Sequence, residues 1–148
     1  MQLIGITVFN DKKTGTLINT IDTKTKLALG KRAKADAIPY LEEKGVKIGK
    51  KPTYAVKQPG KDEFWANPKK ELLGQEWWLI FNNNESMELT VMKVPAYALK
   101  FKSDDDASGL LVRVDKTDLL DLNINTGTFV DRKSGVDFSP FVVKKIKY

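Results

Sequence analysis

The chain has 148 residues, of which 41% are hydrophobic and 30% charged, and its net charge is +6. This length and balance predict a single globular domain over residues 1–148 that buries its own core. Histidine and cysteine are both absent. Their absence excludes Ser-His-Asp and Cys-His catalysis, zinc fingers and disulfides, and leaves carboxylate or lysine chemistry and hard cations held by oxygen. We expect no bound cofactor.

The hydropathy pattern contains no apolar run near the ~20 residues that cross a bilayer. The N-terminal residues Met1 to Gly5 lack the charged and apolar regions of a signal peptide. We therefore expect a cytoplasmic protein that does not bind membranes.

Positive charge is concentrated in the first part of the chain. Residues 1–60 carry 12 Lys and Arg against 5 Asp and Glu, a balance of +7, whereas residues 61–148 carry 13 against 14, a balance of −1. A basic surface attracts anionic partners, because neutralising phosphates releases counterions. The asymmetry therefore favours an anionic partner, with lysine-mediated solubility as the alternative explanation.

In chain order, residues 3–9 and 16–21 flank a polar turn and predict an opening hairpin. Residues 25–44 have apolar side chains at helical spacing, followed by Gly45 where a helix C-cap belongs. This pattern predicts one helical segment. Pro39 lacks a backbone N–H, so we expect a kink there or a second short helix that starts at Pro39 and ends at Lys44.

Residues 45–67 have the composition of a loop around one strand at 53–57. Strands are expected at 76–81 and 87–94, joined by the polar loop 82–86, and again at 97–102. The alternation of apolar residues and Lys over 141–148 is typical of a half-solvated strand.

One phrase recurs four times: Asp or Asn, two residues, Ser or Thr, then Gly. It begins at Asp11, Asp105, Asn123 and Asp131. The first side chain can bond the backbone two residues on, the hydroxyl does so more weakly, and Gly accepts a positive φ. Together the patterns predict an α+β fold, mainly an antiparallel sheet built from hairpins, with the helical segment at 25–44 and closure into a barrel left open.

Basic residues interleaved with aromatic ones are typical of nucleic-acid binding, because charge follows the phosphates while rings stack on bases. Our first hypothesis is therefore a non-enzymatic binding protein that contacts nucleic acid through its basic N-terminal half. The candidate residues are Lys31, Arg32, Lys34, Lys47, Lys50, Lys51, Lys57 and Trp65. The alternative for these residues is a solvated helix face and a lysine-rich loop.

Trp77 and Trp78 form the densest aromatic spot. In an alternating strand one ring points inward and the other outward, so one of the two is a candidate anchor for a protein partner, unless a loop or helix covers it. The second hypothesis is therefore a protein-interaction or inhibitor module of the kind that phages and mobile elements carry. Salt separates the two hypotheses, because phosphate contacts weaken steeply with salt. Oligomeric state and partner identity stay open.

Residues 104–115 resemble part of an EF-hand calcium loop, with Asp104, Asp106 and Ser108 at positions one, three and five and Gly109 at six. Asp115 stands where that loop has a longer Glu, and the flanks have strand patterns rather than helical ones. The alternative is a hairpin turn whose acids face solvent. We expect no metal site.

The third hypothesis is enzymatic. The segments 40–45 and 54–57, the pair Asp62-Glu63 and the strand 77–81 together resemble the core of restriction-endonuclease-like nucleases, over about residues 31–94. In that family two acids bind Mg²⁺ and a following lysine helps to activate water. This chain has Ala55 where the motif has an acid two residues before Lys57, so the resemblance implies a degenerate domain without catalytic residues.

Overall fold

A computed structural model describes residues 33–104 and 108–148 of the chain. The chain divides into two compact units, Met1–Lys47 and Ile48–Tyr148. The predicted opening hairpin, with its turn at residues 11–15, lies outside the described residues, and so do residues 25–32 of the predicted helical segment and residues 105–107. The single domain over residues 1–148 stays a prediction.

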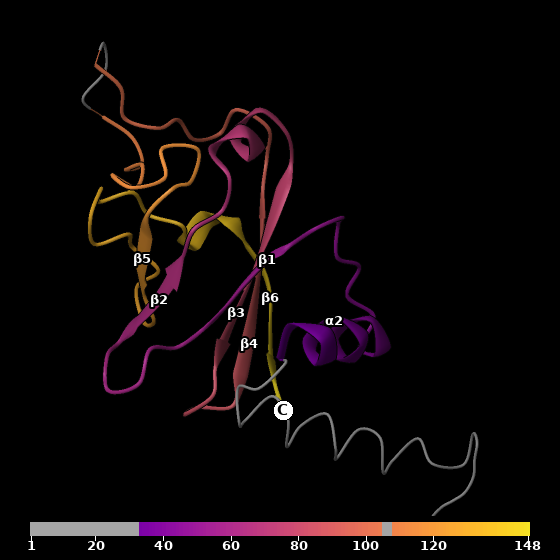
Figure 1. Cartoon of the computed structure of the whole chain (residues 1–148). Helices are drawn as coiled ribbons and strands as arrows, with labels where there is room; N and C mark the ends of the chain where they lie inside the picture. The colour runs from indigo at the N-terminus through magenta and orange to yellow at the C-terminus, as the bar shows by residue number, and fades with distance from the viewer. Residues whose placement is uncertain (1–32, 105–107) are drawn as a thin grey trace, which may run out of the picture. The chain divides into compact units, whose positions relative to one another are not determined.

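The first unit contains helix α2, Ala33–Glu43 (Figure 1). It continues through Pro39, so the expected second helix starting at Pro39 is wrong. Proline removes only its own backbone bond, to the carbonyl of Ala35, and the flanking turns keep theirs. The predicted C-cap is confirmed. Gly45 has φ +83°, and the paired bonds from Gly45 N to Glu42 O (3.0 Å) and from Val46 N to Leu41 O (2.9 Å) form a Schellman motif.

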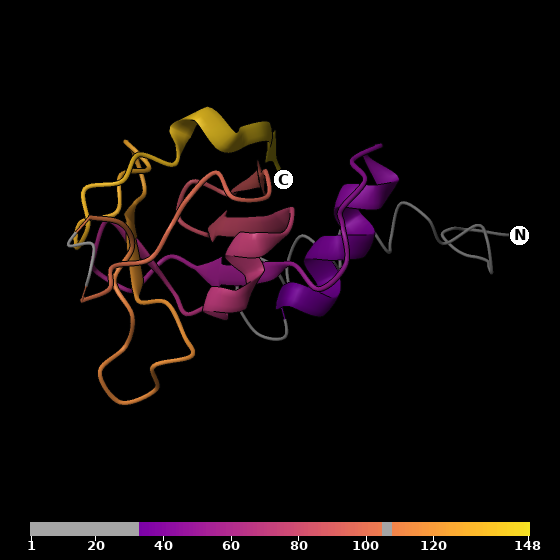
Figure 2. The same cartoon turned by 90° about the horizontal axis from the view of Figure 1, so that it is seen from above.

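The second unit contains a four-stranded sheet in the order β1-β3-β4-β6 (Figures 1 and 2). Its strands are β1 Thr53–Val56, β3 Trp77–Asn83, β4 Glu88–Val94 and β6 Val142–Lys147. β1 is parallel to β3, and the β3–β4 and β4–β6 pairs are antiparallel. The β4–β6 register shifts between Val91, opposite Lys144, and Met92, opposite Val142, so Val143 is the extra residue of a β-bulge. The strands predicted at 53–57, 76–81, 87–94 and 141–148 are therefore confirmed with small shifts in their bounds.

A second, two-stranded sheet pairs β2, Glu63–Ala66, with β5, Leu122–Asn125, in antiparallel fashion. Neither strand is predictable from local sequence, because each has only four residues and its partner is about sixty positions away. The two sheets share one core, in which the ring of Phe64 stacks on that of Phe81 at 4.6 Å between centroids. Two 3₁₀ helices complete the unit, η1 Lys70–Gly74 and η2 Ser139–Phe141.

The turn phrases fold in different ways. Asp131–Gly135 follows the prediction. The Asp131 carboxylate accepts bonds from Lys133 N (3.4 Å) and from the Ser134 hydroxyl, Ser134 Oγ accepts one from Val136 N at 3.2 Å, and Gly135 has φ +78°. Gly109, which ends the phrase begun by Asp105, also has a positive φ of +103°.

In the phrase begun by Asn123, the prediction is wrong. Asn123 lies inside β5, and the turn is capped by Asn125, whose Oδ1 accepts bonds from Gly127 N and Thr128 N, both at 2.8 Å. The left-handed residue is Phe129, with φ +61°, rather than Gly127. Pairing with β2 carries the strand two residues into the phrase and moves the turn along the chain.

Residues 97–102 do not form the predicted strand; Tyr97 has φ +61°, which is outside the β region. The described residues form one α-helix and six strands in two open sheets, so the α+β class with a mainly antiparallel sheet is confirmed and no closed barrel forms among them. None of the helices in the described part of the chain is long and apolar enough to cross a membrane.

Candidate functional site

The structure separates the predicted basic residues. Lys31 and Arg32 lie outside the described residues, and Lys34 and Lys47 are exposed in the first unit. Lys50 and Lys51 are exposed in the second unit, which also contains Lys57 and the three tryptophans. The predicted basic residues are therefore divided between the two units.

Lys57 is not part of an exposed basic surface. Its side chain is 5% exposed, and its ammonium donates to Glu85 Oε2 at 2.8 Å and to Gln58 O at 3.3 Å. The residue extends the line of β1, where its N–H bonds Asn82 O at 2.9 Å, so its side chain reaches the loop that follows β3. The pairing of β1 with β3 brings Glu85 close to Lys57. The sequence contains no sign of this pairing, because the two residues are 28 positions apart.

Trp77 and Trp78 point to opposite faces of β3, as the alternation predicted. Trp77 is 2% exposed and packs in the core cluster with Leu79 and Phe81. Trp78 is half-buried on the other face. Of the two candidate anchors, only Trp78 has accessible surface.

Gly49 packs directly on the indole of Trp78. A Cβ at Gly49 would overlap Nε1 and Cδ1 of the ring and lie 3.1 Å from Cε2. Only glycine allows the backbone to come this close. The contact fixes the chain on the face of Trp78 immediately before Lys50 and Lys51, which are both exposed and, among the described residues, form no ion pair.

Two further lysines lie on the same face of the larger sheet. Lys93 is directly opposite Trp78 in the β3–β4 register, and its Nζ is 5.8 Å from the centre of the ring. Its contact with Glu76 is long, 3.5 Å, and both side chains are about half exposed, so the carboxylate neutralises little of its charge. Lys144 is opposite Val91, two residues from Lys93 on β4, and therefore shares its face.

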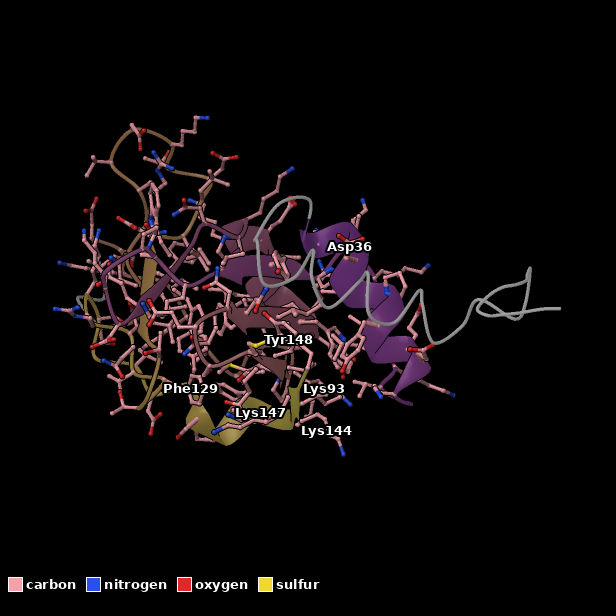
Figure 3. All side chains as sticks on the ribbon, turned by 90° about the horizontal axis from the view of Figure 1, so that it is seen from below. Asp36, Lys93, Phe129, Lys144, Lys147 and Tyr148 are labelled. Carbon is pink, nitrogen blue, oxygen red and sulfur yellow. The ribbon has the colours of Figure 1, made fainter. Side chains whose placement is uncertain are left out.

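Figure 3 shows Lys93 and Lys144 as sticks on these neighbouring strands. We call Lys50, Lys51, Trp78, Lys93 and Lys144 the Trp78 surface. It brings together residues of two separately predicted sites, Lys50 and Lys51 of the nucleic-acid site and Trp78 of the protein-binding site. Lys93 and Lys144 were missed, although the alternating lysines of 141–148 were a usable signal for Lys144.

Trp65 lies on β2, in the smaller sheet, and is 48% exposed. Its surroundings carry both charges. Its Nε1 donates to Asp121 Oδ1 at 3.3 Å, Asp121 also pairs with Lys133, and the Arg113 guanidinium lies 5.9 Å from the ring centre. Because Arg113 and Lys133 are paired with carboxylates, the described residues place no surplus positive charge beside Trp65, which was a predicted nucleic-acid contact.

Two carboxylates of the second unit, Glu63 and Asp115, form hydrogen-bonded ion pairs with arginine. Glu63 accepts from Arg132 at 2.8 Å and from Asn123 Nδ2 at 3.0 Å. Asp115 accepts from Arg113 Nε at 2.9 Å and Nη2 at 2.7 Å, and this hydrogen bonding lowers its pKa. Within residues 33–104 and 108–148, no group of three or more acidic, His or Cys side chains is arranged to hold a metal ion.

Comparison of the chain with protein-family models, with curated proteins and with solved structures found no significant match.

Proposed function

We propose that this chain is a binding protein that contacts nucleic acid through the Trp78 surface. The observation that carries the proposal is the packing of Gly49 on Trp78, which places Lys50 and Lys51 beside the sheet face that contains Lys93 and Lys144. The Lys93 ammonium lies beside the indole, Lys144 shares their sheet face, and Lys50 and Lys51 directly follow Gly49. This combination of lysines and an aromatic ring suits a phosphate backbone with an adjacent base or sugar. Lys34 and Lys47 of the first unit are further candidates for phosphate contacts, whereas Lys57 is not.

The chemistry of the surface sets its expected salt dependence. Each neutralised phosphate contributes about −0.7 to −0.9 to the slope of log affinity against log salt, so four lysines give a slope of about −3. A lysine ammonium group is a compact charge and lacks the planar, two-pronged donor arrangement of an arginine guanidinium. Lysines therefore suit contacts with phosphates, which carry no sequence information, better than hydrogen bonds that distinguish bases. The proposal is accordingly for binding with little sequence preference.

The test is fluorescence anisotropy of the full chain with a labelled oligothymidine and with a labelled duplex, between about 50 and about 200 mM salt. The double variant Lys93→Gln/Lys144→Gln should weaken binding at least about tenfold and reduce the slope by about 1.5. The matched control Lys61→Gln/Lys116→Gln removes the same net charge at exposed positions outside the surface and should leave affinity within about twofold. Absence of wild-type binding at low salt, or equal loss in both double variants, contradicts the proposal.

A protein partner is the second candidate, and the environment of Trp65 favours it. A half-exposed indole surrounded by paired Asp121, Lys133, Arg113 and Asp115 has the composition of an interface anchor with a polar rim. Such an interface tolerates salt. Binding of a protein that survives high salt and is lost in Trp65→Ala, but not in Lys93→Gln/Lys144→Gln, would support this candidate over the first.

A further inference from the structure

We infer that the second unit contains a pocket for a small aromatic anion, formed by η1 and the segment 97–103. The pocket has a volume of about 450 Å³, within the range of about 300 to 1,000 Å³ that is usual for small-molecule sites. Its lining includes Leu73, Leu99, Phe101 and Tyr97. None of its residues belongs to the Trp78 surface, so this inference goes beyond the proposed function and does not depend on it.

Tyr97 contributes an aromatic ring to the lining of the pocket. Its side chain is 83% exposed, an unusual position for a ring of this size. Its backbone is left-handed, with φ +61°, and its N–H bonds Leu73 O at 2.8 Å. The ring also lies close to η1, because a Cβ on Gly74 would be 3.7 Å from its Cε1. A non-glycine residue in this conformation is costly, and it persists only where the surrounding structure holds the backbone in place.

Lys70 gives the pocket a cationic group. Its Nζ lies 4.8 Å from the centre of the Phe101 ring, on the pocket lining, and among the described residues it forms no ion pair. Lys100 also lines the pocket, and among the described residues Glu71 is its single acidic lining residue. The arrangement of apolar walls with an ammonium group beside an aromatic ring suits a ligand with a flat apolar body and one anionic group.

The carboxylate of an aromatic acid and the phosphate of a mononucleotide share this chemistry. The direct probe is 8-anilinonaphthalene-1-sulfonate, an aromatic anion whose fluorescence rises in apolar sites, titrated against the full chain. Indole-3-acetate and adenosine monophosphate are then used as competitors to distinguish the two sources.

Charge variants give opposite expected effects. Lys70→Gln should weaken probe binding about fivefold and Glu71→Gln should strengthen it by a similar factor, since each removes one partly exposed charge from the lining. The adjacent exposed pair Lys61 and Asp62 provides matched controls, and Lys61→Gln and Asp62→Asn should leave the affinity unchanged. Tyr97→Asn keeps a residue that tolerates the left-handed conformation but removes the ring, and should abolish binding.

Displacement of the probe by either competitor, together with the opposed effects of Lys70→Gln and Glu71→Gln, supports the inference and identifies the source. Four results overturn it: no fluorescence rise with wild type, equal effects in the control variants, effects of the same sign at Lys70 and Glu71, or displacement by neither competitor. Near-ultraviolet circular dichroism of each variant separates a lost site from a lost fold. Nucleic-acid binding measured on the same proteins should not change in Tyr97→Asn. The test of the pocket is therefore independent of the test of nucleic-acid binding by the Trp78 surface.

Discussion

The hydroxyl of Tyr148 donates a hydrogen bond of 2.7 Å to Oδ1 of Asn82, across 66 positions of the sequence. On its other side the same amide donates from Nδ2 to the hydroxyl of Tyr54 at 2.9 Å. Asn82 is fully buried at the end of β3, and Tyr148 is held there by its own N–H, which bonds Met87 O at 2.9 Å. This polar bridge connects β1, β3 and the residue that follows β6.

We expect Tyr148→Phe to lower the free energy of unfolding by about 1 kcal/mol, because it removes one buried hydrogen bond and keeps the ring. Chemical denaturation measures the change. Tyr97→Phe is the matched control, since the Tyr97 side chain is 83% exposed, and it should leave stability unaltered. Equal effects of the two substitutions would contradict the structural role of the bridge.

The two glycines that end neighbouring turn phrases should respond differently to alanine. Gly135 has φ +78° and open space around it, so Gly135→Ala should cost about 1 kcal/mol through backbone strain alone. Gly127 has no positive φ and an added Cβ would lie 3.4 Å from Asn125 Oδ1, so Gly127→Ala should be nearly neutral. Thermal or denaturant unfolding of both variants tests this, and the reverse order would refute the turn assignments.

The Lys57–Glu85 pair is asymmetric, since the two side chains are 5% and 67% exposed. Glu85→Ala leaves a nearly buried ammonium without its carboxylate and should cost about 1 to 2 kcal/mol. Lys57→Met leaves Glu85 in water and should cost less. Denaturant midpoints of both variants decide this, and salt-dependent nucleic-acid binding should be unchanged in Lys57→Met if Lys57 is no part of the binding surface.

The bond from Arg113 holds the pKa of Asp115 below its ordinary value of 3.8. Stability from this pair is therefore fully present above the unfolded-state pKa and is lost as the pH falls through the lower folded-state pKa. The pKa of Asp137 is also lowered, chiefly by the backbone N–H of Ser139. In an NMR titration, Arg113→Gln should raise the midpoint of Asp115 and leave that of Asp137 low; a parallel rise of both would contradict this pairing.

Prediction from sequence was most successful where a feature depends on a few neighbouring residues. The cap at Gly45, the turn Asp131–Gly135 and the opposed directions of Trp77 and Trp78 are all set within five residues by backbone conformation or strand alternation. The β3–β4 hairpin is equally local, because its strands are joined by a loop of four residues. Each of these features was predicted.

The candidate site was only partly predictable. Lys50, Lys51 and Trp78 were named, but as members of two sites, and the contact of Gly49 with Trp78 that joins them spans about thirty residues. Lys93 and Lys144 join the surface only through strand register. Lys57 was assigned to a basic surface because nothing near it in the sequence indicates its pairing with Glu85.

The sequence by itself determined the α+β class, the main hairpin, the absence of thiol and imidazole chemistry and the excess of lysine. These follow from composition and from local hydrogen bonding, which short stretches of chain decide alone. The tertiary structure alone decided the parallel β1–β3 pairing, the β2–β5 sheet, the left-handed Tyr97 and the position of Lys93 beside Trp78. These features could not be predicted for the same physical reason. Each depends on contacts between distant segments, and burial of the common core, rather than any local preference, selects the register of those segments.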